Sequence, residues 1–188
     1  MILPIVAYGT QVLRRKADDI AREYPELRAL VANMWDTMYN ANGVGLAAPQ
    51  IGLSFRLFVV DSVQLEDDED REMTQSGIKK VFINAEILHQ DGTPWMYEEG
   101  CLSIPDIRAE VSRPDLIRIR YLDEDFVEHT EEYDGLNGRI IQHEYDHIEG
   151  KLFTDRIGAL KKRLLKNRLE DISKGKVDVR YKMKFPLR

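Results

Sequence analysis

Residues 134–150, DGLNGRIIQHEYDHIEG, contain the feature that most restricts how this chain can fold. Asp134 can cap a helix over residues 135–149, and Gly150 can end it. The helix would have two non-polar or histidine-bearing faces, one with Leu136, Ile140, His143, Glu144 and His147, the other with Ile141, Tyr145 and Ile148. Because a helix that is apolar on more than one side has to be covered on those sides, we expect it to lie at the centre of the fold.

The remaining sequence predicts the elements that cover this helix. Two further helices are expected over residues 25–41 and about 156–174, and the start, MILPIVAYGT, is typical of a strand. Short runs typical of strands, several with alternating apolar and polar residues, span 55–61, 79–87, 93–99, 107–112, 116–123 and 125–133. We therefore expect an α+β fold, in which antiparallel β-strands wrap around a central buried helix, with an N-terminal helix and a basic C-terminal helix.

Length and composition indicate one ordinary globular domain. The chain has 188 residues, of which 43% are hydrophobic and 32% charged, and no repeat or linker divides it. No apolar run is long enough to span a membrane, and the first ten residues lack the basic start of a signal peptide. A cytoplasmic location without a membrane partner is the expectation. The lone cysteine, Cys101, excludes an internal disulfide.

Charge is divided unevenly along the chain. Residues 161–188 hold 11 basic and three acidic side chains, a net charge of +8, whereas residues 1–160 hold 16 and 30, a net charge of −14. The basic end can be a docking surface or simply a solvated helix face. The acidic stretch EDDEDRE, residues 66–72, is expected to be an exposed loop.

The sequence HEYDH, residues 143–147, matches the pattern H-E-x-x-H. On a helix, His143 and His147 share a face and can bind one metal ion, and Glu144 is placed as the general base of a hydrolase. The alternative is a buried helix with two hydrogen-bonded histidines. A catalytic metal commonly has three protein ligands and one open position, so a third ligand is needed.

EEGCLS, residues 98–103, offers that ligand. Gly100 lets the backbone turn at the end of a predicted strand, and Cys101 follows it. A thiolate binds borderline-soft divalent metals well. The alternative for Cys101 taken alone is a buried, inert thiol.

GVGLAAPQIG, residues 43–52, is expected to form a tight loop. It fits a loose dinucleotide-binding pattern, but a helix rather than a strand precedes it and Pro49 blocks an immediate helix, so we reject that function. As a loop facing a substrate, Gly43 and Gly45 would allow close backbone approach, and Gln50 would supply an amide donor.

These three stretches together resemble the peptide deformylase family, which is marked by GxGLAAxQ, EGCLS and HExxH in that order. They occur here at 43–50, 99–103 and 143–147, and the resemblance extends over nearly the whole chain and suggests the bacterial single-domain form. It implies that Cys101, His143 and His147 bind one divalent metal, with water in the open position. Cys/His/His ligands accept Fe²⁺, Zn²⁺, Ni²⁺ or Co²⁺, and the resemblance favours Fe²⁺.

The implied substrate is the N-formyl group on the first methionine of a newly made polypeptide, with formate as a product. Glu144 would transfer the protons, while the Gln50 side chain and the Leu102 N–H would stabilise the oxyanion. The residues implied to bind the peptide and its methionine are Val44, Gly45, Tyr97, Glu99, Gly100, Arg108, Leu136, Arg139, Ile140 and His143. Arg139 departs from the family, where an aliphatic residue is common; either its stem lines the wall with the guanidinium in water, or substrate preference differs.

Two other functions compete with deformylation. One is an H-E-x-x-H metallopeptidase, against which Cys101 argues because its third ligand is usually a carboxylate or histidine. The other is a non-catalytic ribosome-associated factor that keeps a metal site. For a deformylase, we expect the basic C-terminal helix to meet ribosomal RNA through Lys161, Lys162, Arg163, Lys166 and Arg168. No DNA partner is expected.

Overall fold

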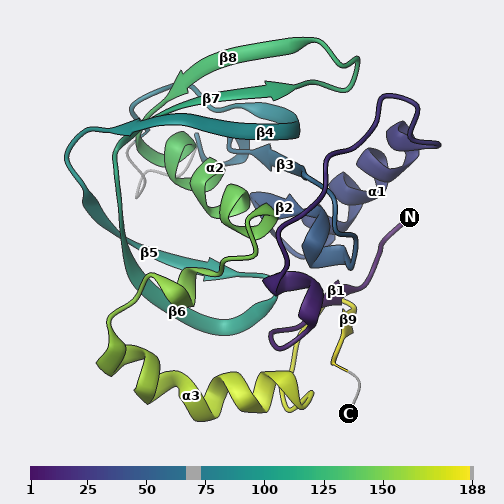
Figure 1. Cartoon of the computed structure of the whole chain (residues 1–188). Helices are drawn as coiled ribbons and strands as arrows, with labels where there is room; N and C mark the ends of the chain where they lie inside the picture. The colour runs from purple at the N-terminus through teal and green to yellow at the C-terminus, as the bar shows by residue number, and fades with distance from the viewer. Residues whose placement is uncertain (67–72, 187–188) are drawn as a thin grey trace.

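The computed structural model describes residues 1–66 and 73–186. In Figure 1, helix α2 (Gly135–Ile148) lies between a five-stranded sheet and a two-stranded hairpin. The sheet has the order β2-β3-β4-β7-β8 and consists of Gly45–Ala47, Leu57–Asp61, Lys79–Asp91, Leu116–Leu122 and Glu128–Tyr133. The hairpin consists of β5 (Trp95–Cys101) and β6 (Ile104–Arg113). All pairings within the sheet and the hairpin are antiparallel, so the expected α+β fold around a central H-E-x-x-H helix is confirmed.

Strand β3 separates two apolar layers. Phe58 and Val60 belong to one cluster with Ile140 and Ile141 of α2. The alternate side chains of β3 point the other way and join a second cluster, which includes helix α1 (Leu27–Asn40). Because both faces are covered, all five residues of β3 are buried, which explains its continuous apolar sequence.

Helix α1 confirms the helix expected over residues 25–41, with ends that differ by one or two residues. Val31, Met34 and Met38 recur at helical spacing and are almost fully buried. They pack on the face of the sheet opposite α2, so the sheet is a middle layer between two helices.

The hairpin β5–β6 covers the other side of α2. Ile107, Ala109 and Val111 alternate along β6 and form a third apolar cluster with Leu169 and Ile172 of helix α3 (Ala159–Ser173). The pairing shifts register at the end of β5, where Gly100 pairs with Arg108 but Cys101 pairs with Ile104. The chain therefore turns at Gly100–Cys101, as the glycine suggested.

The stretch 43–52 differs from the expected loop. Gly45–Ala47 form the edge strand β2, and Ala48–Ile51 form one turn of 3₁₀ helix. Pro49 does not prevent this turn, because a proline in the first turn of a helix lacks only an N–H that would have no helical partner. Gly52 ends the turn with a φ of 87°, in the left-handed region.

The two ends of the chain pair with one another. Strand β1 (Ile5–Val6) lies parallel to β9 (Met183–Lys184), a strand that the sequence did not predict. The N-terminal strand is thus much shorter than the apolar run MILPIVAYGT. The C-terminal segment is not a free tail, because it returns from α3 to the body of the molecule beside β1 (Figure 1).

Some local expectations are corrected or untested. Asp134 is the N-cap of α2 by position, but its carboxylate makes no cap hydrogen bond and instead accepts one from the Thr74 hydroxyl at 2.5 Å. Of the predicted acidic loop, Glu66 is exposed and residues 67–72 lie outside the described part of the chain. In the described ranges, no helix is long and apolar enough to cross a membrane.

Candidate active site

Helix α2 presents His143, Glu144 and His147 from the middle of the fold. The imidazole rings of His143 and His147 lie 5.2 Å apart between centroids, as expected for side chains four residues apart on a helix. Glu144 and His147 are buried, and His143 is partly buried. Burial depresses the pKa of His147 well below its usual value, which favours the neutral imidazole that binds a metal.

Cys101 comes from the opposite side, at the end of β5. Its Sγ lies 3.3 Å from His147 Nε2, and one ligand atom each from Cys101, His143 and His147 lie within 4.8 Å of one another. The Nδ1 of His143 is 2.9 Å from Glu99 Oε2, which leaves its Nε2 for the site. Two imidazole nitrogens and one sulfur at this spacing suit a borderline-soft divalent cation. The residues present therefore fit a single metal ion.

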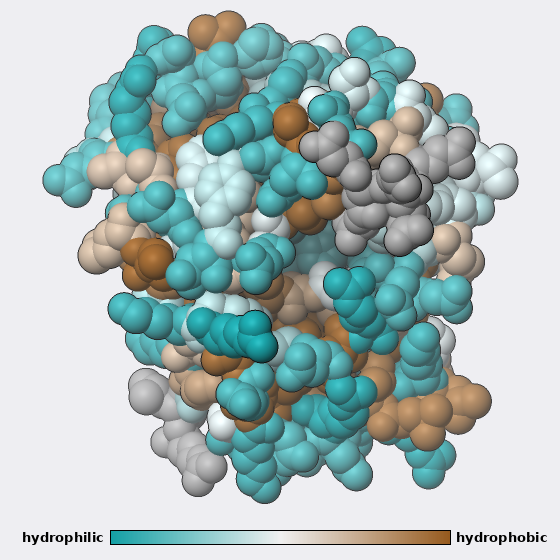
Figure 2. All heavy atoms as spheres, turned by 180° about the vertical axis from the view of Figure 1, so that it is seen from behind, coloured by the Kyte–Doolittle hydropathy of each residue, from teal (hydrophilic) through white to brown (hydrophobic). Residues whose placement is uncertain are grey.

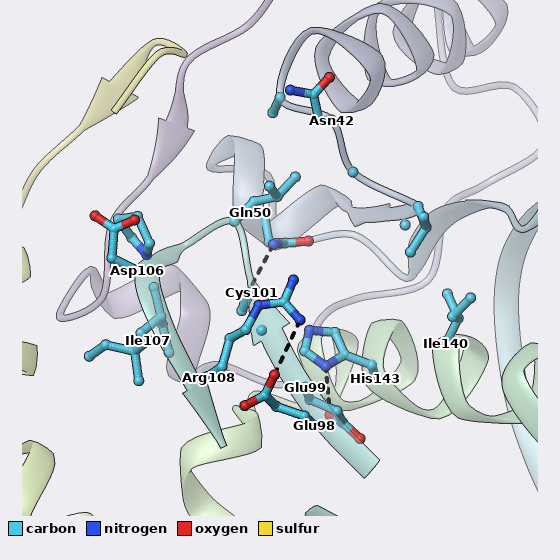
Figure 3. Close-up of a pocket in the computed structure, with 18 of the residues that line it drawn as sticks. Asn42, Gln50, Glu98, Glu99, Cys101, Asp106, Ile107, Arg108, Ile140 and His143 are labelled. Atoms are coloured by element: carbon cyan, nitrogen blue, oxygen red, sulfur yellow. Dashed lines mark hydrogen bonds and ion pairs between the residues drawn. The ribbon is translucent and has the colours of Figure 1, made fainter. Parts of the chain in front are cut away.

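Gln50 is held in one orientation beside the cysteine. Its side-chain carbonyl accepts the Ala47 N–H at 2.8 Å, so its amide nitrogen faces the site, 3.5 Å from both Cys101 Sγ and Ser103 Oγ (Figure 3). The side chain is 1% exposed. The 3₁₀ turn after β2 thus delivers an amide donor, as proposed from the sequence.

Glu144 is a buried carboxylate whose pKa is raised to about 7, mainly by burial and partly countered by the nearby charge of His143. Its Oε2 has no hydrogen-bond partner among the described residues. A Cβ on residue 45 would lie only 2.5 Å from Glu144 Oε1, so Gly45 is needed for β2 to pass this close to the carboxylate.

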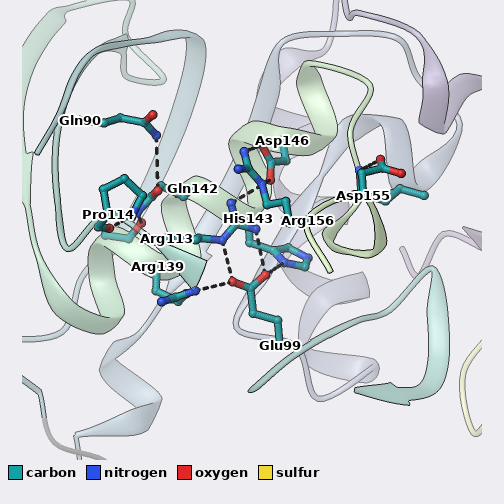
Figure 4. Close-up of polar contacts among 12 residues, drawn as sticks. Gln90, Glu99, Arg113, Pro114, Arg139, Gln142, His143, Asp146, Asp155 and Arg156 are labelled. Atoms are coloured by element: carbon teal, nitrogen blue, oxygen red, sulfur yellow. Dashed lines mark hydrogen bonds and ion pairs between the residues drawn. The ribbon is translucent and has the colours of Figure 1, made fainter. Parts of the chain in front are cut away.

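A chain of charged side chains, buried except for Arg156, lies behind the two histidines (Figure 4). Arg113 donates two hydrogen bonds to Glu99, at 2.6 and 2.9 Å, and a third to Asp146 at 2.8 Å. Arg156 donates two more to Asp146, both at 2.6 Å. Burial alone would raise the pKa of Glu99, but the bonds from Arg113 and His143 hold it well below its usual value. Glu99 therefore stays ionised and fixes the His143 ring.

The structure excludes one of the two sequence-based alternatives for Arg139, the one that places its guanidinium in water. Its guanidinium does not reach water, because the side chain is only 2% exposed. It donates to Glu99 at 3.0 Å and to the backbone carbonyls of Val111 and Trp95 at 2.8 and 2.7 Å. The guanidinium also lies over the Trp95 ring, 4.3 Å from its centroid. The hairpin thus supplies both the charge and the carbonyl groups that allow an arginine where an aliphatic residue was expected.

A cleft of about 730 Å³ opens onto these groups. Figure 2 shows this side of the molecule, where a recess lies near the centre among mostly hydrophilic side chains. All residues predicted to bind the peptide line the cleft, namely Val44, Gly45, Tyr97, Glu99, Gly100, Arg108, Leu136, Arg139, Ile140 and His143. Arg108 is exposed, and its Nη1 lies 3.7 Å from Glu98 Oε2; both residues are labelled in Figure 3.

Several residues of the site were not predicted from the sequence. Asn42, Asp106 and Ile107 line the cleft beside predicted neighbours, and residues 178–181 approach it from the C-terminal segment. Among the residues behind the histidines that were not predicted, Arg113 could have been identified from the sequence. It follows Ile107, Ala109 and Val111 at intervals of two along β6, so its position belonged to the buried face of the strand.

The fold and the site define a class of protein. The cleft brings together three ligand atoms suited to one divalent cation, a buried glutamate and an amide donor. This combination is typical of a mononuclear metallohydrolase. Comparisons with known proteins give the family. The sequence model described as polypeptide deformylase matches residues 2–163. The chain belongs to the peptide deformylase family, whose members remove the N-formyl group from newly made peptides with one divalent metal ion.

Individual relatives agree along the whole chain. A peptide deformylase of Christiangramia forsetii is 55% identical, with 99% of this chain and 97% of the relative covered. One from Cytophaga hutchinsonii is 52% identical, and all of both chains is covered. The crystal structure of a peptide deformylase from Legionella pneumophila is 34% identical and superposes with a TM-score of 0.80, covering 94% of this chain and 98% of that one. These matches favour deformylation over the metallopeptidase and the non-catalytic factor.

Proposed function

We propose that Cys101, His143 and His147 bind the metal ion of this deformylase and that Glu144 carries the protons. The observation that supports this most directly is the convergence of their three ligand atoms within 4.8 Å, next to a carboxylate oxygen that has no other partner in the described residues. When bound, the divalent cation polarises the formyl carbonyl and lowers the pKa of water. Glu144 must be ionised to act as a base, and a nearby cation favours that form.

Glu144 then acts first as a base and afterwards as an acid. It takes a proton from the attacking water as the water oxygen adds to the formyl carbon. When the C–N bond breaks, it returns a proton to the departing amine, so that formate and a free N-terminal methionine leave. Burial raises the pKa of the Glu144 carboxyl, and the charge of a bound cation would lower it again, so the carboxylate would be ionised when the water attacks.

Gln50 and Leu102 are proposed to stabilise the negative charge that develops on the formyl oxygen. The Gln50 amide nitrogen already faces the site because its carbonyl oxygen is held by Ala47. Leu102 follows Cys101 directly at the turn between β5 and β6, so its backbone N–H lies close to the sulfur proposed to bind the metal. Such donors are typically worth about 10²–10³ in rate each.

The peptide is proposed to bind along β2, which is the edge strand of the sheet. Gly45 lines the cleft and would pair with the peptide backbone there, as an edge strand does when it accepts an extended chain. The methionine side chain would enter the part of the cleft lined by Val44, Tyr97, Leu136 and Ile140. Glu99 and Arg139 would form the buried end of this part of the cleft. Because Arg139 donates a hydrogen bond to Glu99, the methionine side chain would not meet an unpaired charge there.

Iron is the proposed native metal, on the basis of the sequence resemblance. If Fe²⁺ is present, peroxide inactivates the enzyme through the iron or the Cys101 thiolate. The Ni²⁺ form is expected to resist, and the measurement is the residual rate of formate release after equal exposure of both forms. Equal sensitivity of the two forms would contradict an iron-centred route.

The test of the proposed site is formate release from a formyl-methionyl tripeptide before and after a chelator. We expect activity to disappear with the metal and to return on adding one equivalent of a divalent cation. A Cys101→Ser variant would bind the metal more weakly, so its activity is expected to fall at a lower chelator concentration. If chelator removes the metal and formate release continues, the metal site is not the reaction centre.

Helix α3 is proposed to dock on ribosomal RNA. All five basic residues predicted for this role are exposed. Arg168 is engaged, because it donates to the Asp106 carbonyl at 2.5 Å, and Lys162 lies 3.2 Å from Asp155. The surface that remains for phosphate is therefore made by Lys161, Arg163 and Lys166, of which Lys166 has only a long, exposed contact with Glu170 at 4.0 Å. The acidic body would repel phosphate and so orient the encounter toward α3.

The docking test neutralises those three residues and leaves Arg168 in place. We expect salt-sensitive co-sedimentation with ribosomes to be lost while activity on a free formyl-methionyl tripeptide stays. A matched control neutralises Arg15, Arg22 and Arg118, which are exposed elsewhere. If both triple variants co-sediment as the parent does at low salt, α3 is a solvated helix.

Because ribosome-bound nascent chains are the substrate, we also propose a cytoplasmic enzyme whose residues 1–188 form a single catalytic domain.

A further inference from the structure

The segment after α3 forms part of the cleft wall. Residues 178–181 line the cleft, and two residues later the chain enters β9, which is paired with β1. The match to the family's sequence model covers residues 2–163, so this segment lies outside the matched part of the chain. Tyr181 is the residue of this segment that makes a polar contact with the site.

The Tyr181 hydroxyl donates a hydrogen bond of 2.8 Å to the backbone carbonyl of Leu102. Its ring and the Leu102 side chain are both partly buried against the apolar cluster between α1 and the sheet. The tyrosine is therefore held at two points, by its ring in the core and by its hydroxyl on the turn that follows Cys101.

The next carbonyl of the same turn is held from the other end of the chain. Ser103 O accepts the backbone N–H of Tyr8 at 2.8 Å. Tyr8 follows β1. The N–H groups of Ile5, in β1, and of Ala7, just after it, donate to the carbonyls of Lys182 and Lys184, both at 2.9 Å. Both chain ends thus converge on two consecutive carbonyl groups of the turn Cys101–Leu102–Ser103, and they are also bonded to each other.

This turn carries three groups of the site. Cys101 supplies the sulfur ligand, Leu102 the proposed oxyanion N–H, and Ser103 Oγ lies 3.5 Å from the Gln50 amide nitrogen. A hydrogen bond to the Leu102 carbonyl holds the peptide plane between Leu102 and Ser103. The Leu102 N–H belongs to the preceding plane, which is joined to the held one only through φ and ψ of Leu102, so holding one plane narrows the range of directions open to that N–H. An error of about 1 Å in such a donor can cost on the order of 10²-fold in rate.

We propose that Tyr181 is a positioning residue for the deformylation reaction, and that through its hydroxyl the C-terminal segment holds the Leu102 N–H in place for the developing oxyanion. The proposal rests on the oxyanion role of Leu102 given above. It also separates the basic end of the chain into two parts, since α3 faces outward whereas residues 178–184 serve the active site.

The test removes only the hydroxyl, with Tyr181→Phe. We expect kcat for a formyl-methionyl tripeptide to fall about tenfold, less than the 10²–10³ expected for complete loss of an oxyanion donor, while KM changes less than about twofold. In ¹⁵N NMR spectra, the Leu102 and Ser103 amides are expected to shift and to exchange with solvent faster. The matched control is Tyr24→Phe, a partly buried tyrosine packed edge-on against Phe55, which is expected to leave kcat and both amides unchanged.

Several outcomes would overturn the inference. An unchanged kcat in a folded Tyr181→Phe protein would do so, and so would a raised KM at constant kcat, which is the sign of a substrate-binding wall. Shifted amides without a change in kcat would show that Tyr181 holds the turn but does not position it for catalysis. None of these results would affect deformylation itself, which is measured as formate release by the parent enzyme. If that release is absent, the proposed site fails, whereas the amide shifts remain measurable.

Discussion

Ion pairs in two regions of this molecule have the same chemistry and opposite surroundings. Behind the histidines, Arg113 is 0% exposed, and its partners Glu99 and Asp146 are 4% and 5% exposed. On α3, Lys166 lies 4.0 Å from Glu170, with the two side chains 72% and 48% exposed. The buried charges cannot move apart without losing every partner, so they fix the His143 ring. Water can replace the partner of an exposed charge at little cost, so the exposed charges remain available to bind another molecule.

The largest expected effect comes from breaking the buried group. Arg113→Ala removes two hydrogen bonds from the buried Glu99 and one from the buried Asp146, and it is expected to reduce the free energy of unfolding by about 3–5 kcal/mol. Urea denaturation measures this. The matched control, Arg120→Ala, removes an exposed arginine 2.5 Å from Glu86 and is expected to cost about 0–1 kcal/mol. Equal costs for the two variants would remove the distinction between the regions.

A smaller effect is expected on the metal. Glu99→Gln keeps the shape of the side chain but removes the charge that holds His143, and it is expected to weaken metal binding about 10–100-fold. Competition with a chelator of known affinity measures the change. Glu110→Gln, on the exposed side of the same hairpin, serves as the control and is expected to have the affinity of the parent. An unchanged affinity in Glu99→Gln would mean that the buried charges do not serve the histidine.

Glu131 is intermediate in exposure between the two regions, and the pH dependence of its contribution to stability tests the comparison between them. Burial would raise its pKa, but hydrogen bonds from Lys80, Tyr121 and Tyr133 lower it from 4.5 to about 2. Since the folded pKa is the lower one, the stability from Glu131 is fully present above pH 4.5 and is lost as the pH falls toward 2. We expect the stability difference between the parent and Glu131→Gln to shrink over that range. A difference that stays constant down to pH 2 would contradict the shifted pKa.

The smallest effect is expected on α3. Lys166→Ala removes the exposed pair with Glu170, and because alanine favours the helix, the free energy of unfolding is expected to change by less than about 0.5 kcal/mol. Urea denaturation again measures it, and adding salt should not alter the difference noticeably. A cost of several kcal/mol would show that α3 depends on this pair.

The sequence predicted what depends on local pattern. The helix over 135–149 was found nearly end to end as α2, and the motifs that contain Gln50, Cys101 and Glu144 meet in one cleft. These elements repeat with helical or strand periodicity and carry residue types with few alternative roles. The predicted α+β fold followed from the same patterns, because a helix that is apolar on two sides needs covering layers.

What the sequence did not predict depends on contacts between distant residues. Strand β9 has only two residues and forms because β1, at the other end of the chain, lies beside it. The burial of Arg139 depends on Glu99 and on two carbonyl groups of the hairpin, which no local pattern reveals. Tyr181 has no motif around it, and its contact with Leu102 spans 79 residues. Arg113 is the exception, since the alternation along β6 already marked its position as buried.

The most direct test of the account measures turnover and metal content together in Glu144→Gln. The metal ligands remain, so the variant is expected to bind one metal per chain as the parent does. Its kcat for a formyl-methionyl tripeptide is expected to fall about 10²–10⁴-fold, because the group proposed to carry the protons is lost. Glu110→Gln is expected to match the parent in both measurements. Near-normal formate release by a fully metal-loaded Glu144→Gln enzyme would contradict the central claim that this buried carboxylate is the base.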